Sequence, residues 1–143
     1  SLCEFLAEIV TEISAEQSDI CFTKLDFDAV VFIDKNRFVQ VVENLINNAR
    51  KYAKTKIDIW SEQKDNSIFI HFRDYGEGIP DNDMPFVFEK FYRGRNSKDE
   101  QGSGLGLYIV KYIIEHMKGL ILLHNHSDGL EATLILPIQK SIA

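Results

Sequence analysis

The chain has 143 residues, of which 45% are hydrophobic and 27% are charged, which suits one globular domain with a buried core. The net charge of −6 at pH 7 argues against a nucleic-acid partner, because no basic face dominates the surface. No apolar run approaches the about 20 residues that a membrane-spanning helix needs, so we expect no direct membrane contact from this fragment.

The chain begins at Ser1 rather than at Met, inside a pattern that indicates a helix, so we expect a fragment excised from a longer protein. Its two cysteines, Cys3 and Cys21, are too few for a disulfide framework, and we expect reduced thiols in a cytosolic compartment. His124 and His126 are two positions apart in a predicted strand and therefore share a face. No acidic or thiol residue has the spacing to complete a metal site with them.

The first half of the chain predicts two helices separated by short extended segments. Apolar residues recur with the helical period over residues 2–13, and extended stretches follow at 20–25 and 29–33. Asp34 is the predicted N-cap of a long helix that ends near Tyr52. The apolar stripe of this helix is formed by Phe38, Val41, Val42, Leu45, Ile46 and Ala49.

The second half predicts two hairpins around a third helix. Strands at 56–63 and 67–73 alternate apolar and polar residues, a helix runs from about Leu105 to Met117, and strands at 120–124 and 132–136 close the chain. Residues 74–104 lack periodicity, which at this length is typical of either a functional lid or a disordered segment. The predicted fold is a single α/β domain over residues 1–143, a two-layer sandwich whose mixed, largely antiparallel sheet is covered on one face by three helices.

The long helix carries a second, polar stripe. Asn44, Asn48, Lys51 and Tyr52 follow one another at helical spacing beside the apolar positions. Asn is unfavourable in helix interiors, so two on one face need a reason. An ordinary polar face is one interpretation. The other is a site for Mg²⁺ and phosphate, because Mg²⁺ prefers oxygen ligands and commonly takes only one or two from the protein, while Lys51 supplies a positive charge for phosphates.

Two motifs follow in the irregular stretch. Residues 74–80 read Asp-Tyr-Gly-Glu-Gly-Ile-Pro, in which Asp74 can accept a hydrogen bond from an exocyclic amine and the glycines let backbone approach a flat ring. Many turns have similar sequences, so this motif alone is weak. Residues 88–94 interleave aromatic and charged side chains, and Arg93 can reach a terminal phosphate. A loop anchored by its aromatic residues is the simpler interpretation of that segment in isolation.

Residues 102–107, Gly-Ser-Gly-Leu-Gly-Leu, open the third helix. Exposed backbone N–H groups and the helix dipole favour an anion at such a position. The G-x-G-x-G spacing after an irregular loop disfavours a dinucleotide-binding fold, and the missing G-K-[ST] ending excludes a P-loop.

The four motifs in this order resemble the nucleotide-binding domain of sensor histidine kinases, in the superfamily of DNA gyrase, the MutL mismatch-repair proteins and the heat-shock chaperone ATPases. The resemblance spans about residues 5–137 and matches the N box (44–52), first glycine box (74–80), F box (88–94) and second glycine box (102–107). It implies a Bergerat-type ATP-binding fold, with residues 88–104 as an ATP lid.

The resemblance also implies ATP and Mg²⁺ as cofactors and a set of site residues. Asn48 is implied to coordinate Mg²⁺ with Asn44 in or near its shell, and Asp74 to accept the adenine amino group. The implied catalytic residues are Asn48, Lys51 and Arg93. The implied nucleotide-binding residues are Asn44, Asn48, Lys51, Tyr52, Asp74, Gly76, Gly78, Ile79, Tyr92, Arg93, Gly102, Ser103, Gly104, Leu105, Gly106, Leu107 and Thr133. Thr133 is expected near Asp74, although it follows Ala132 where the family reads Gly-Thr.

The implied activity is that of an ATP-dependent protein-histidine kinase in two-component signal transduction. The domain would donate the γ-phosphoryl group to a histidine on an adjoining dimerisation domain that this fragment lacks. His116 lies on a late helix before Met117 and is not that histidine. The expected partners are this dimerisation domain and a response-regulator receiver domain. We expect a homodimeric full-length protein and a cytoplasmic domain of a membrane-anchored sensor.

Two alternatives stay open. One is an ATPase or serine-kinase module of the same superfamily, and the other is a degenerate nucleotide-sensing domain without phosphotransfer. Asn44 occupies the position where the gyrase and chaperone ATPases carry a catalytic Glu, which argues against ATP hydrolysis as the main activity.

Overall fold

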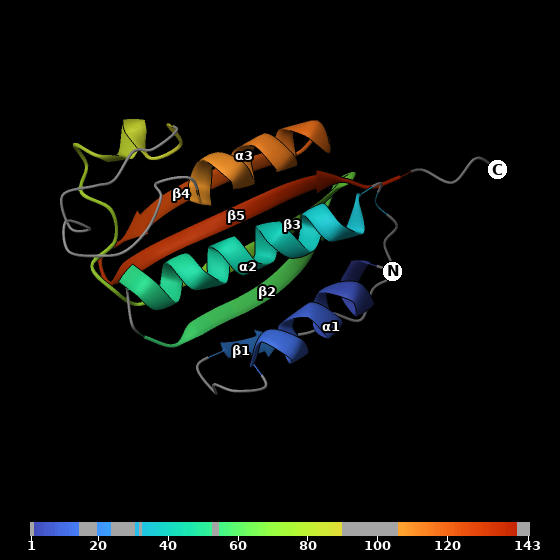
Figure 1. Cartoon of the computed structure of the whole chain (residues 1–143), viewed down its shortest axis with the longest axis horizontal. Helices are drawn as coiled ribbons and strands as arrows, with labels where there is room; N and C mark the ends of the chain where they lie inside the picture. Colours follow the sequence, from blue (N-terminus) through green and yellow to red (C-terminus); the bar gives the residue numbers. More distant parts are fainter. Residues whose placement is uncertain are drawn as a thin grey trace.

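The protein is described by a computed structural model over residues 2–14, 20–23, 31, 33–52, 55–89 and 106–139. Within these ranges three α-helices lie against one face of a five-stranded sheet, which confirms the predicted two-layer sandwich (Figure 1). The elements are α1 (Leu2–Ser14), β1 (Ile20–Thr23), α2 (Lys35–Tyr52), β2 (Ile57–Lys64), β3 (Ser67–Arg73), the 3-10 helix η1 (Met84–Phe86), α3 (Gly106–His116), β4 (Leu120–His126) and β5 (Gly129–Pro137).

The sheet is mixed and largely antiparallel, as predicted. Its strand order is β1-β2-β3-β5-β4. β1 runs parallel to β2, whereas the other neighbouring strands are antiparallel. The second hairpin is longer than the sequence predicted, because polar residues near its turn continue the ladder from His124 opposite Glu131 to His126 opposite Gly129. Of the predicted stretch 29–33, residues 31 and 33 are not in a strand, and the rest lies outside the described residues.

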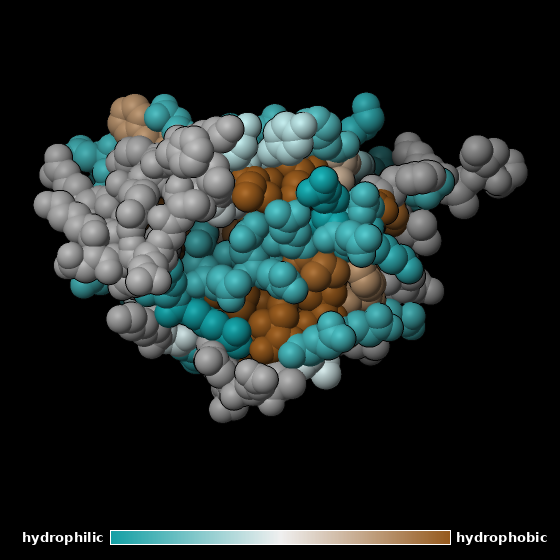
Figure 2. Space-filling view, viewed as in Figure 1, coloured by the Kyte–Doolittle hydropathy of each residue, from teal (hydrophilic) through white to brown (hydrophobic). Residues whose placement is uncertain are grey.

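Helix α2 forms as its sequence predicts. Its N-cap is Asp34, whose Oδ1 accepts hydrogen bonds from the backbone N–H groups of Asn36 and Arg37 at 3.0 and 3.2 Å. The apolar stripe packs inward, with Phe38 fully buried in the core. Hydrophilic residues line the exposed side of the helix, and hydrophobic residues are visible on either side of it (Figure 2). No helix in the described ranges is both long and apolar enough to cross a membrane.

The strands alternate between the two faces of the sheet, and this alternation decides which side chains can reach the helices. In β3, Ile68 and Ile70 are fully buried beneath the helices, while His71 points to the opposite face and pairs in register with Thr133. In β5, Leu134 faces the core in the same way. We refer to the face of the sheet without helices as the open face.

Candidate functional site

Asn44 and Asn48 of α2 lie one helical turn apart on the same side of the helix, as their spacing predicted, and both are half-buried. The side-chain nitrogen of Asn44 is buried and has no hydrogen-bond partner within the described part of the chain. An unpaired buried amide is unfavourable by about 1–3 kcal/mol, so a partner that completes this site is expected. An amide flip exchanges nitrogen and oxygen with little change in shape, so the same position can present the oxygen that Mg²⁺ requires.

Helix α3 begins directly against Asn48. A Cβ atom added to Gly106 would lie 3.3 Å from Oδ1 and 3.5 Å from Nδ2 of that asparagine. Gly106, the last glycine of the second glycine motif, and Asn48 of the polar stripe are 58 positions apart in the sequence and therefore meet only through the fold. Backbone N–H groups at a helix start and a neighbouring amide oxygen are suited to an anion and its counter-ion. Leu107 follows Gly106 and packs against the core, and Lys51 lies on the last turn of α2.

Asp74 is held rigidly at the end of β3. It is buried, with 8% of its surface exposed. Its Oδ1 accepts hydrogen bonds from the backbone N–H groups of Gly76 at 3.1 Å and Leu130 at 3.0 Å. The backbone N–H of Asp74 donates to the carbonyl of Leu130 at 3.0 Å. No described residue hydrogen-bonds to Oδ2, so one carboxylate oxygen stays available to accept from a ligand.

The loop after Asp74 requires glycine where the motif has it. Gly78 has a φ of 78°, a conformation that side chains rarely adopt. Next to it, the backbone N–H of Ile79 donates to Oδ1 of Asn125 at 3.0 Å, and Nδ2 of Asn125 donates to the Ile79 carbonyl at 2.6 Å. Sequence reasoning missed Asn125. The available signal was a polar residue that continues the inward-facing alternation of Ile121 and Leu123 in β4.

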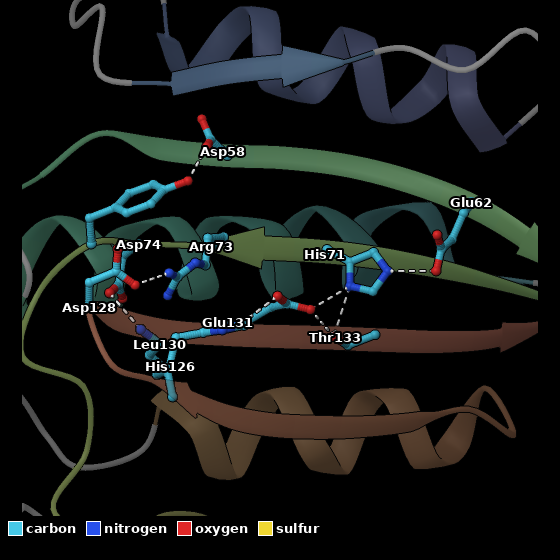
Figure 3. A network of polar contacts seen from close by, with 11 residues as sticks. Asp58, Glu62, His71, Arg73, Asp74, His126, Asp128, Leu130, Glu131 and Thr133 are labelled. Atoms are coloured by element: carbon cyan, nitrogen blue, oxygen red, sulfur yellow. Dashed lines mark hydrogen bonds and ion pairs between the residues drawn. The ribbon is translucent and has the colours of Figure 1, made fainter.

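The structure corrects the expectation for Thr133. Its hydroxyl lies 3.0 Å from Nδ1 of His71 and 3.3 Å from Oε2 of Glu131, on the open face (Figure 3). The contact of Asp74 with β5 is made by the backbone of Leu130 instead. The reason is the two-residue period of the strand, which directs Thr133 away from the helices and therefore away from the asparagines of α2.

Several predicted site residues cannot be placed against this geometry. Tyr92, Arg93, Gly102, Ser103, Gly104 and Leu105 lie outside the described residues, as does the side chain of Tyr52. Their implied roles remain predictions.

A polar network that the sequence did not reveal occupies the open face (Figure 3). Glu131 is its centre, with Oε2 at 2.8 Å from Nδ1 of His71 and Oε1 at 3.0 Å from Nε2 of His126. Burial raises the pKa of Glu131, but the hydrogen bonds to His126 and His71 outweigh it and hold the pKa below its ordinary value. Trp60 stacks on the His71 ring with centroids 4.7 Å apart.

Contacts on the open face also hold the two residues that flank Asp74, Arg73 and Tyr75. Arg73 forms an ion pair with Asp128, and this hydrogen bond lowers the pKa of the Asp128 carboxyl. The Arg73 guanidinium also lies 4.6 Å from the centroid of the Tyr75 ring. The Tyr75 hydroxyl donates to Asp58, and this bond raises the pKa of Tyr75. These contacts fix the backbone on both sides of Asp74 from beneath the sheet.

No three or more His, Cys, Asp or Glu side chains are grouped to hold a metal ion in the part of the chain that the structure describes. His124 and His126 do share a face, as predicted, with ring centroids 4.7 Å apart. The asparagine pair of α2 offers amide oxygens, which Mg²⁺ accepts as ligands when phosphate and water supply the others.

The sequence is similar to known sensor kinases. Residues 33–140 match the family "Histidine kinase-, DNA gyrase B-, and HSP90-like ATPase". The chain is 32% identical over 117 residues to the signal transduction histidine-protein kinase BaeS of Escherichia coli (strain K12), covering 78% of the chain and 25% of BaeS. It is 31% identical over 136 residues to the sensor histidine kinase component HK1 of Mycobacterium tuberculosis (strain ATCC 25618 / H37Rv), covering 94% of the chain and 80% of HK1.

The fold is also shared with solved histidine kinase structures. The mycobacterial sensor histidine kinase MprB superimposes with a TM-score of 0.78 at 25% identity, covering 98% of this chain and 96% of MprB. The histidine kinase domain of the E. coli osmosensor EnvZ gives a TM-score of 0.78 at 26% identity, covering 99% and 89%. The chain spans about a quarter of the length of BaeS. The match over residues 33–140, together with these relatives, shows that the chain belongs to the histidine kinase-, DNA gyrase B- and HSP90-like ATPase family, as the ATP-binding catalytic domain of a histidine kinase.

Proposed function

We propose that this domain binds Mg-ATP between α2 and the start of α3 and donates the γ-phosphoryl group to a histidine on an adjoining dimerisation domain. The observation that carries the proposal is the meeting of Asn48 with Gly106, near the buried side-chain nitrogen of Asn44, which has no hydrogen-bond partner among the described residues. That arrangement offers a metal ligand and anion-binding backbone groups within one small region.

Each residue has a separate role in the proposed site. Asn48 and Asn44 would hold Mg²⁺, which when bound neutralises charge on the phosphates. Lys51 and Arg93 would contact phosphate oxygens as positive charges. Asp74 would accept a hydrogen bond from the adenine amino group through its Oδ2, because its Oδ1 is already occupied.

The remaining residues would shape the nucleotide pocket. Gly78 and Ile79 would line the base, and Gly106 and Leu107 would present the start of α3 to the phosphates. A histidine nitrogen on the partner domain would attack the γ-phosphorus in line, as the bond to the bridging oxygen breaks and ADP leaves. Such a transfer depends mainly on positioning and charge neutralisation, so this domain needs no nucleophile of its own.

The wider setting is also part of the proposal. The relatives are named as signal-transduction and sensor kinases, which supports a two-component system with a dimerisation domain, a response-regulator receiver domain and a homodimeric full-length protein. We place this domain in the cytoplasm as part of a membrane-anchored sensor. A superfamily ATPase is the second candidate, but Asn44 lacks the carboxylate needed to activate water.

The test has two parts. Calorimetry should detect ATP binding by this chain that depends on Mg²⁺ and is lost in the Asn48→Ala variant. The full-length protein incubated with ATP labelled in its γ-phosphate should then form an acid-labile phosphohistidine, again dependent on Asn48. Absence of ATP binding by folded protein would overturn the proposal, and rapid multiple-turnover hydrolysis by the isolated chain would favour the ATPase alternative.

A further inference from the structure

The β4–β5 hairpin holds both ends of the loop from Asp74 to Ile79. Asn125 and Leu130 are register partners across that hairpin. Leu130 holds the first end through its backbone, whose carbonyl accepts from the Asp74 N–H and whose N–H donates to Oδ1 of Asp74. Asn125 holds the other end, because its side-chain amide both accepts from and donates to the backbone of Ile79. One cross-strand pair therefore sets the distance between the carboxylate and the last residue of the loop.

Asn125 also leaves no free space beside Gly78. A Cβ atom on Gly78 would lie 2.6 Å from Oδ1 of Asn125, closer than real contacts of this kind allow. The positive φ of Gly78 and the contact with Asn125 therefore constrain the same peptide. Two hydrogen bonds and one steric contact from a single side chain define where the Gly78–Ile79 backbone lies.

We propose that Asn125 is a positioning residue for base recognition, which acts by holding the Gly78–Ile79 backbone at a set distance from the carboxylate of Asp74. This inference rests on the proposed function, in which those residues line the nucleotide base. Adenine presents an amine to a carboxylate at the position where guanine presents a carbonyl oxygen. A rigid loop keeps this position of the base opposite the Asp74 carboxylate and so favours adenine, whereas a loose loop can shift to accommodate either base.

The first experiment compares ligands that have a base with one that has none. In Asn125→Ala the affinity for ATP should fall about tenfold, as expected for two lost hydrogen bonds, and the preference for ATP over GTP should narrow. Affinity for inorganic tripolyphosphate should stay at the wild-type value, because the phosphate region does not involve the loop. An equal loss for all three ligands would overturn the proposal and indicate a general structural effect.

Two further variants separate positioning from folding. Asn125→Asp keeps the shape of the side chain but replaces the donor to the Ile79 carbonyl with a second oxygen, so it should also lose the preference for ATP. His124→Ala changes an exposed neighbour on the same strand and should behave as wild type. Amide hydrogen exchange without nucleotide should show faster exchange at Ile79 in Asn125→Ala, which removes the acceptor of the Ile79 N–H, and no change in His124→Ala. Unchanged exchange at Ile79 would contradict the inference.

A double-mutant cycle tests the steric contact directly. Gly78→Ala should weaken ATP binding more in the wild-type background than in Asn125→Ala, where the close approach to Oδ1 is relieved and only the strain of the positive φ remains. If the losses of ATP affinity in Gly78→Ala and Asn125→Ala simply add in the double variant, the two positions do not interact and the steric part of the inference is wrong. Failure of the proposed function is distinguishable, because the unmodified chain would then bind no ATP. Failure of this inference leaves wild-type binding intact, and the Asn125 variants then either match wild type or lose affinity equally for all three ligands.

Discussion

Gly106 lies against the side-chain amide of Asn48, so that a Cβ at position 106 would approach Oδ1 to 3.3 Å. This contact joins the first residue of α3 to the polar stripe of α2. A larger residue at 106 must displace the amide by a few tenths of an ångström. The contact therefore links the position of the expected Mg²⁺ ligand to the helix start that would face the phosphates.

Gly106→Ala tests this link. We expect ATP affinity to fall several-fold, because the displaced Asn48 amide no longer has the geometry that the metal requires. Stability should be maintained or improved slightly, since Ala favours a helix over Gly by up to about 1 kcal/mol. Calorimetry and thermal unfolding measured on the same preparation separate the two effects. Wild-type affinity in this variant would show that the contact has no functional role.

Asn48→Ala should abolish Mg²⁺-dependent ATP binding while the domain stays folded. The residue is half-buried at the edge of the core, so the expected loss of stability is only about 1 kcal/mol. Titrating ATP with and without Mg²⁺ provides the measurement, and Asn47→Ala, an exposed neighbour on the same helix, is a matched control. If Asn48→Ala retains the full effect of Mg²⁺, another residue holds the metal.

Asp74→Asn should alter base preference with little effect on the fold. In the wild-type protein the backbone N–H groups of Gly76 and Leu130 donate to Oδ1, and the amide oxygen of the substituted side chain can accept from them in the same way. The amide nitrogen then replaces Oδ2 and donates, so it no longer matches the adenine amine. We expect weaker ATP binding and a smaller preference over GTP by calorimetry. An unchanged ratio of the two affinities is the result that contradicts the assigned role.

The open-face network makes a prediction about acid stability. The pKa of Glu131 in the folded protein lies below its ordinary value of 4.5 because His126 and His71 hydrogen-bond to its carboxylate. A depressed folded-state pKa means that the stabilisation is fully present above the unfolded pKa and is lost as the pH falls through the folded value. Urea unfolding between pH 7 and about pH 3 should therefore show a decline in the free energy of unfolding below the unfolded pKa.

Glu131→Gln should remove that part of the pH dependence. The variant should be less stable than wild type at pH 7, and the difference should shrink at low pH, where the wild-type carboxyl is protonated. Glu115→Gln changes an exposed carboxylate on α3 and should leave the pH profile unchanged. A stability difference between Glu131→Gln and wild type that stays constant with pH would show that the carboxylate charge has no part in the network.

Much of the site could be predicted because its motifs are local. An Asp directly before an apolar helical period predicts an N-cap, and Asp34 is one. Gly78 adopts a positive φ that few other residues tolerate. The asparagine stripe follows from helical spacing within one element. Such features depend on neighbours within a few residues, which the sequence displays directly.

The error at Thr133 had a different origin. Which residue of β5 contacts Asp74 depends on cross-strand register and on the face to which each side chain points, and one position of difference exchanges the two faces. Thr133 is in register with His71, so both side chains point to the open face and the Thr133 hydroxyl belongs to the network there. The backbone of Leu130 makes the contact with Asp74, and backbone contacts have no sequence signal.

The amino-acid sequence by itself determined the helices, the hairpins and the order of the nucleotide-binding motifs, because periodicity, capping and turn chemistry act over short stretches of chain. Only the tertiary structure decided that Gly106 lies against Asn48, that Asn125 holds Ile79, and that His71 and Glu131 meet on the open face. Each of these pairs joins residues tens of positions apart, and their contact depends on how the sheet pairs and how the helices pack on it.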